Sequence, residues 1–386
     1  MPNYPAEVFV DPSEKLVFLT PELVQFVPST KKAFEAVDNV FTSEPEAHLK
    51  HLEESLFTFK SSTGADISCS LVPGKGSELL VMWAPFSDGT PNSSAETMYQ
   101  YITGEVTSKI KAAPNSWNQL TKSGVVAELL KATGQEMPVL TIFSPLPSVP
   151  NNAYTHQGYK QIRRGNFTPA SRITSEAIQH AQDRLHGSKS ETQIDELHLH
   201  GASLGASSAI GAANGLLTVA NRAIRTVTAQ ELIVAPRNVF PDLAARFTVK
   251  GTVGEVSEKE VDDSWVAIDE PLIRQRIDGK GNEPMMFARM LRGMSKVSRL
   301  KGLTRPNRNE TPQLIENLIN SDVAVLLPLA ENSGLTHDTP KYLPNTGEQI
   351  IQVRAIKGER AAHLIDEHVA LTALMAVMNI LQNSNR

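Results

Sequence analysis

The chain has little of what marks several large classes of protein. Its 386 residues include one cysteine, Cys69, so no disulfide forms within the chain and a zinc site built on cysteine pairs is excluded. The net charge is −5, and no basic, aromatic-rich stretch is present that would bind nucleic acid. No run of 18 apolar residues occurs, so we expect no stable membrane insertion. The first residues lack the basic and apolar regions of a secretory signal, which makes a cytoplasmic location the expectation.

Short apolar runs of strand length alternate with helical patterns along most of the chain. A hairpin is predicted at 55–60 and 67–73, and further strands at 78–85, 138–143, 196–200, 226–235, 322–329 and 349–356. Helices are expected at 95–112, 117–133, 170–185, 206–215 and 368–383. This alternation indicates an α/β protein with a mainly parallel central sheet and helices on both faces. Such sheets bind ligands at the carboxyl ends of their strands.

The sequence Gly201-Ala202-Ser203-Leu204-Gly205 stands at the end of one predicted strand and directly before a run of small residues. Strand, Gly-x-Ser-x-Gly and helix, in that order, are typical of a nucleophile elbow, a tight turn that pushes the serine hydroxyl out of the sheet edge. Strand and helix nearly touch in such a turn, so the outer positions must lack bulk, as glycine does. Ser203 is therefore the candidate nucleophile. The alternative is an ordinary structural strand–helix turn.

The hairpin, the loop after Trp83-Ala84-Pro85, the elbow, and a late strand followed by His363 resemble the α/β-hydrolase fold in their order. The resemblance covers about 55–236 and 320–386, which would form the core. Residues 1–54 would then be an N-terminal extension, and 237–319 a cap or lid insertion. Two features depart from the common pattern: Pro85-Phe86 replaces a His-Gly pair, and no Gly-x-x-Asp follows the penultimate strand.

The resemblance implies a Ser-His-acid triad. A serine hydroxyl needs a base within hydrogen-bond reach, and the fold places that base after the last strand. His363 fits this position, and His368 is the nearest rival. The acid that orients the base follows the penultimate strand, where Glu331 is the first choice and Asp338 the alternative.

Hydrolysis of an acyl group also needs donors for the developing oxyanion. The elbow would supply the backbone N–H of Leu204. The second donor would come from the loop after Pro85, which has no N–H itself, so Phe86 is the candidate and Ser87 the next.

Two other features carry potential chemistry. His198 and His200 alternate along one strand and point the same way, but no acidic or histidine partner lies at a useful spacing, so structural histidines are expected rather than a metal site. Met286, Met290 and Met294 fall on one face of a helical stretch in the expected cap, and flexible thioethers suit an adaptable apolar surface. A cap helix that simply packs on the core has the same pattern.

The sequence thus predicts a serine hydrolase that cleaves a carboxylic ester or thioester through a covalent acyl-enzyme, with no metal and no organic cofactor. Its expected partner is a small molecule with an apolar acyl part; the sequence allows a homo-oligomer without requiring one. The alternative is a non-catalytic binding or assembly protein with the same fold and a degenerate site. A dinucleotide-binding oxidoreductase is disfavoured, since no Gly-x-Gly-x-x-Gly is present.

Overall fold

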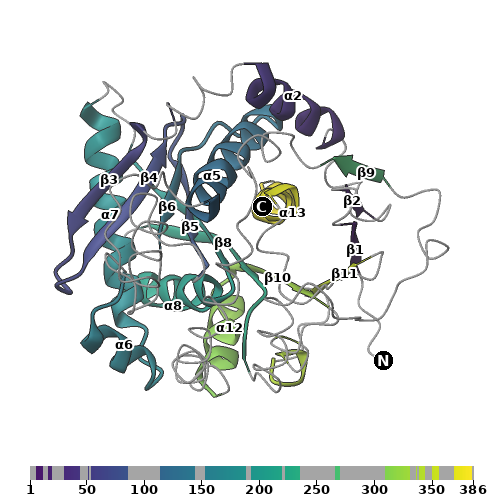
Figure 1. The fold of residues 1–386 in the computed structure, drawn as a ribbon. Coiled ribbons are helices and arrows are strands. Elements are labelled where there is room, and N and C mark those ends of the chain that lie inside the picture. The colour runs from purple at the N-terminus through teal and green to yellow at the C-terminus, as the bar shows by residue number, and fades with distance from the viewer. Residues whose placement is uncertain are drawn as a thin grey trace, which may run out of the picture.

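A central sheet dominates the computed structural model of the chain (Figure 1). The residues that the structure describes are 6–11, 16–19, 30–43, 51, 54–85, 114–143, 153–187, 193–219, 222–234, 266–269, 309–330, 336, 339–343, 350–355 and 369–384. Their strands are β1 (Ala6–Asp11), β2 (Leu16–Leu19), β3 (Leu56–Lys60), β4 (Asp66–Val72), β5 (Glu78–Trp83), β6 (Val139–Ile142), β7 (Glu196–Ala202), β8 (Ala223–Gln230), β9 (Val266–Asp269), β10 (Ala324–Ala330) and β11 (Ile350–Ala355). Their helices are α2 (Thr30–Ser43), α5 (Pro114–Ala132), α6 (His156–Ile162), α7 (Thr168–Gly187), α8 (Leu204–Val219), α12 (Glu310–Asn320) and α13 (Val369–Asn383), with a short 3-10 turn, η3 (Thr339–Lys341).

The strands of the described chain lie in the order β3-β4-β6-β5-β7-β8-β10-β11-β1-β2-β9. The hairpin β3–β4 is antiparallel and joins β6 in an antiparallel pair. From β6 through β5, β7, β8, β10 and β11 to β1, every neighbouring pair is parallel. The carboxyl ends of β5, β7, β8, β10 and β11 therefore meet at one edge of the sheet.

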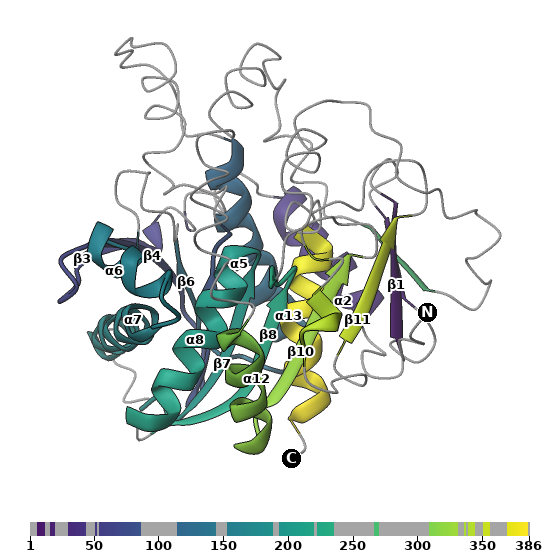
Figure 2. The same ribbon diagram turned by 90° about the horizontal axis from the view of Figure 1, so that it is seen from below.

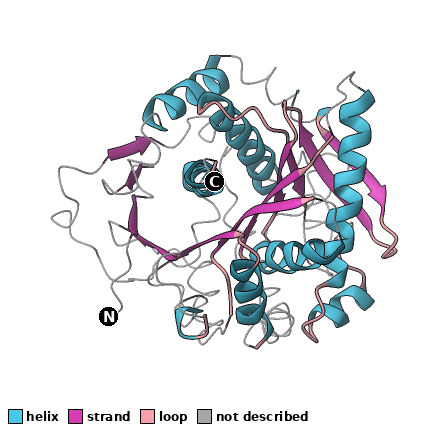
Figure 3. Cartoon of the chain, turned by 180° about the vertical axis from the view of Figure 1, so that it is seen from behind, coloured by secondary structure: helices cyan, strands magenta, loops and turns pink. Residues whose placement is uncertain are grey.

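Helices cover both faces of this sheet, and its central strands are therefore buried on each side. Helices α2, α5 and α13 pack with one apolar cluster, and α6, α7, α8 and α12 pack with the other. Figure 1 shows α5 and α13 on one side of the sheet and α8 and α12 on the opposite side. In Figure 2, α8 and α12 lie in front of β7, β8 and β10, and Figure 3, the view from behind, shows helices on both sides of the central strands.

The observed architecture confirms the predicted fold class, a mainly parallel α/β sheet with helices on both faces. The hairpin and the strands and helices expected around the elbow are present with shifts of a few residues at their ends. The predicted end of one strand was wrong: the strand expected at 226–235 ends at Gln230. The next residue, Glu231, has a φ of 53° and leaves the strand conformation.

The sheet also takes in segments that the sequence assigned elsewhere. β1 and β2 come from the expected N-terminal extension, and β9 comes from the expected cap. The predicted helix at 95–112 and most of the cap lie outside the described residues, so the division into extension, core and cap stays a prediction. None of the helices in the described part of the chain is both long and apolar enough to cross a membrane.

Candidate active site

Ser203 stands alone between the last residue of β7 and the first residue of α8. Its φ is 57°, a left-handed conformation that residues other than glycine adopt rarely and at a cost of about 1–3 kcal/mol. The backbone around it is fixed: the N–H of Ser203 donates to the carbonyl of Gln230 at 2.9 Å, and the N–H of Ala206 donates to the carbonyl of Ser203 at 3.1 Å. The predicted strand–turn–helix context of Ser203 is therefore present.

Glycine is required on both sides of this turn because backbone approaches backbone there. A Cβ on Gly201 would overlap the carbonyl of Gly205. A Cβ on Gly205 would overlap the carbonyl of Trp83 and lie 2.7 Å from that of Ala84. These contacts hold the start of α8 against the end of β5 as well as against β7. The sheet, the tight turn and α8 follow one another in the order that the resemblance to the α/β-hydrolase fold implied, with the strained serine at the sheet edge.

Leu204, the first oxyanion candidate, begins α8. The N–H groups in the first turn of a helix have no carbonyl partner within the helix, and the positive end of the helix dipole lies there. This end of α8 can therefore stabilise negative charge beside Ser203. The contacts of Gly205 with Trp83 and Ala84 bring the chain that leads to Phe86 and Ser87 next to the same turn, although Phe86 and Ser87 themselves lie outside the described residues.

The predicted base and acids also fall outside the described residues: His363, His368, Glu331 and Asp338. The elements that flank them are placed. β10 ends at Ala330, directly before Glu331, and β11 ends at Ala355 at the same edge of the sheet as the elbow. The assignments of base and acid stay predictions.

Glu231 is a residue near the elbow that sequence reasoning missed. It follows the last residue of β8 and is fully buried, with 0% of its surface exposed. Its N–H donates to the carbonyl of Pro328 at 2.8 Å, and the hydroxyl of Thr336 donates to its Oε2 at 3.4 Å. The available signal was the polar pair Gln230-Glu231 interrupting an apolar run, which the expected strand at 226–235 had absorbed.

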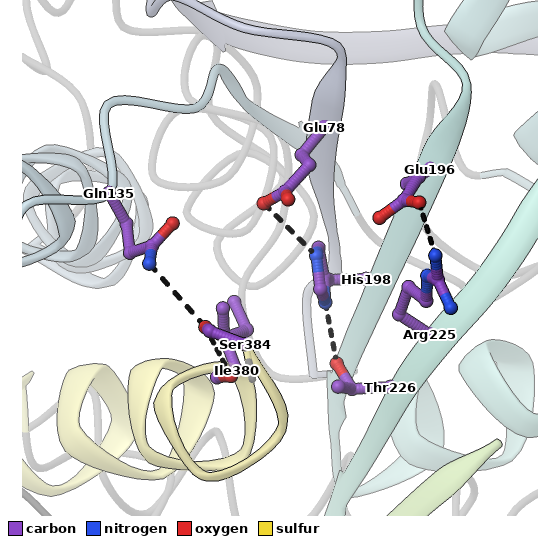
Figure 4. Close-up of polar contacts among 8 residues, drawn as sticks. All are labelled: Glu78, Gln135, Glu196, His198, Arg225, Thr226, Ile380 and Ser384. Atoms are coloured by element: carbon purple, nitrogen blue, oxygen red, sulfur yellow. Dashed lines mark hydrogen bonds and ion pairs between the residues drawn. The ribbon is translucent and has the colours of Figure 1, made fainter. Parts of the chain in front are cut away.

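His198 and His200 contact their neighbours in the sheet. Figure 4 shows His198 between Thr226, whose Oγ1 is 3.0 Å from Nδ1, and Glu78, whose Oε2 is 3.5 Å from Nε2. The contact with His198 lowers the pKa of Glu78, against the opposing effect of partial burial. Within the described residues, no group of three or more His, Cys, Asp or Glu side chains could hold a metal ion.

His200 lies two residues further along β7, toward the elbow. Its Nε2 is 3.4 Å from Oε1 of Gln230, whose Nε2 in turn donates to the hydroxyl of Thr372 at 3.5 Å. Burial lowers the pKa of His200 to about 4, which keeps the ring neutral at pH 7.

No protein-family model matches the chain, and no curated protein matches it in sequence. Solved structures similar to the chain include the rice cell wall degrading esterase LipA from Xanthomonas oryzae, with 13% identity, 86% of this chain and 90% of the other covered, and a TM-score of 0.43. The hyperthermophilic esterase from Pyrobaculum calidifontis is similar at 12% identity, with coverage of 95% and 98% and a TM-score of 0.42.

Proposed function

We propose that the protein is a serine hydrolase that cleaves a carboxylic ester or thioester. The observation that carries the proposal is the left-handed Ser203, held between β7 and α8 at the carboxyl edge of a parallel sheet. A strained serine at this position presents its hydroxyl at the N-terminus of a helix, where developing negative charge is stabilised. Backbone strain of this kind at a buried residue is concentrated at functional sites.

In the proposed reaction, Oγ of Ser203 attacks the carbonyl carbon of the substrate while His363 accepts the hydroxyl proton. The carbonyl oxygen becomes an oxyanion that accepts hydrogen bonds from the N–H of Leu204 and from a second donor, Phe86 or Ser87. Collapse expels the alcohol or thiol, which takes the proton from His363, and leaves an acyl group on Ser203. Water then attacks this ester with His363 again as the base, releasing the acid and restoring the serine.

The proposed substrate is a small ester or thioester with an apolar acyl part. This preference rests on the methionine pattern at 285–294 alone, a stretch outside the described residues. No metal or organic cofactor takes part in the proposed steps. A non-catalytic binding or assembly protein with the same fold is the alternative. Two features favour it: the Pro85-Phe86 pair in place of His-Gly, and the absence of Gly-x-x-Asp after the penultimate predicted strand.

The direct test is hydrolysis of a p-nitrophenyl ester by the full chain and by two serine variants. Ser203→Ala should lower kcat/KM about a thousandfold or more, because loss of the nucleophile removes the covalent route. The matched control is Ser207→Ala, which changes a buried serine one turn further along α8 and should keep the parent rate. Equal activity in the Ser203→Ala variant and its parent would contradict the proposal.

A further inference from the structure

Glu231 lies beside the elbow because β7 and β8 are parallel neighbours. Ala202 pairs with Gln230 in the register of these two strands, and the N–H of Ser203 donates to the carbonyl of Gln230. Glu231, the residue directly after β8, therefore lies opposite Ser203, the residue directly after β7. Its carboxylate belongs to the edge of the sheet where the proposed reaction takes place.

Two features of Glu231 are unfavourable by themselves. Burying a carboxylate away from water is costly, and Glu231 is the one Asp or Glu among the described residues that is buried. A φ of 53° adds backbone strain. Of the three left-handed residues other than glycine in the described chain, Ser203 and Glu231 are buried, whereas Asp322 lies in an exposed turn. Backbone strain and a buried carboxyl group at adjacent positions of one sheet edge are typical of a functional site.

The position of Glu231 is well supported. Thr336 contacts its carboxylate, and the hydroxyl of Thr339 donates to the carbonyl of Leu232 at 2.9 Å. The chain after β8 is thus tied to the connection between β10 and β11, which is the connection where sequence order placed the acid. Both Thr336 and Thr339 are buried, so these contacts are shielded from water.

We infer that Glu231 is the carboxylate that orients the base of the proposed triad, in place of Glu331 or Asp338. This inference rests on the proposed function. In this role the carboxylate accepts the Nδ1–H of the histidine, leaves Nε2 to accept the serine proton, and stabilises the imidazolium that forms. A water-excluded carboxylate interacts with that cation more strongly than a solvated one does. Glu231 is then a positioning residue, since it acts through the histidine.

The test compares kcat and the pH profile of ester hydrolysis for Glu231→Gln and Glu231→Asp with the parent, using a p-nitrophenyl ester. Glu231→Gln keeps the shape and the contact with Thr336 but removes the charge, so kcat should fall about a hundredfold or more. The acid limb of kcat/KM should move to lower pH, because a negative charge no longer favours the imidazolium. Glu231→Asp keeps the charge and shortens the reach, so its kcat should lie between those of Glu231→Gln and the parent, with the acid limb nearly in place.

Asp322→Asn is the matched control, since it removes a carboxylate from the other left-handed acidic residue at an exposed site. It should leave kcat and the pH profile as in the parent. If Glu231→Gln does not fold, the kcat of Glu231→Asp decides: a loss of about tenfold supports the role and a parental value overturns it.

Variants of Glu331 and Asp338 distinguish failure of the role of Glu231 from failure of the proposed function. A parental kcat and pH profile in Glu231→Gln, with the loss found instead in Glu331→Gln or Asp338→Asn, overturns the role of Glu231 and leaves the proposed function standing. A parent that is no more active than its Ser203→Ala variant overturns the proposed function, and this inference with it.

Discussion

Ser203 and Glu231 show how differently two neighbouring residues can be read from a sequence. The Gly-x-Ser-x-Gly motif reports local sterics, since both glycines are demanded by backbone contacts within a few residues of the serine or with β5. Ser203 could therefore be predicted. The burial of Glu231 depends on Thr336 and on Pro328, about a hundred residues further along the chain. No local sequence pattern predicts those contacts, and Glu231 fell within the strand predicted at 226–235.

His200 makes a residue-scale prediction about stability and pH. Its pKa in the folded state is about 4, against an ordinary value of 6.5, because burial disfavours the charged ring. Between these two pH values the unfolded chain binds a proton on His200 that the folded chain does not. The contribution of neutral His200 to the free energy of unfolding is therefore fully present above pH 6.5 and is lost as the pH falls toward 4. Over that range the parent should lose about 3 kcal/mol through this group.

The measurement is the free energy of unfolding by denaturant between pH 7 and pH 4. His200→Gln keeps an N–H for Gln230 but cannot be protonated, so its stability should depend less steeply on pH than that of the parent. His156→Gln, at an exposed position of α6, should follow the parent. Identical pH dependence in His200→Gln and the parent would show that the imidazole is not buried in its neutral form.

At the scale of elements, a polar seam joins α13 to the centre of the sheet. We use this name for His198 and His200 of β7, for Thr226, Thr228 and Gln230 of β8, and for Thr372 and Asn379 of α13. The opposite face of the same two strands is apolar and packs against α8. The alternation of polar and apolar residues is visible in the sequence, but it suggests an exposed face, whereas the structure buries the polar face and pairs it.

Asn379 is the strongest link of the polar seam. Its Nδ2 lies 3.2 Å from the carbonyl of Val227, 3.1 Å from the hydroxyl of Thr228 and 3.2 Å from the carbonyl of Ala324, so one side chain ties α13 to both β8 and β10. Asn379→Leu has similar volume but no donor. It should lower the free energy of unfolding by about 1–3 kcal/mol, since buried acceptors lose their partner.

The control for Asn379 is Asn383→Ala, one turn further along α13. Asn383 donates only to Asn379 in the described contacts and is partly exposed, so its replacement should cost less. Denaturant unfolding of both variants at pH 7 provides the comparison. A larger loss for Asn383→Ala than for Asn379→Leu would contradict the role of the polar seam.

Local elements were predictable where one segment carries its own pattern. The hairpin β3–β4, the apolar strands and the helices α5, α7, α8 and α13 were predicted from patterns within a short window, whereas α2 and α12 were not predicted. β1, β2 and β9 were missed because each is short and is stabilised only by distant partners: β1 pairs with β11 near the other end of the chain, and β9 pairs with β2. The sequence of a short apolar run does not indicate which distant strand it pairs with.

At the scale of the whole molecule, parallel pairing brings residues that are far apart in the chain to one edge of the sheet. The elbow after β7, Glu231 after β8, and the ends of β10 and β11 come from widely separated parts of the chain, and parallel pairing places them side by side. This convergence explains why the place of Ser203 at this edge could be predicted from the order of the elements, although the end of β8 was predicted at 235 and lies at Gln230. The choice among carboxylates could not, because it depends on which side chain the fold buries.

Covalent labelling of the intact chain tests the central claim, a reactive nucleophile at Ser203, most directly. A fluorophosphonate reacts with a serine only where a base and an oxyanion site activate it. We predict one adduct per chain, mapped by peptide mass spectrometry to Ser203, and no adduct in the Ser203→Ala variant. An unlabelled Ser203, under conditions in which a known serine hydrolase is fully labelled, would contradict the claim.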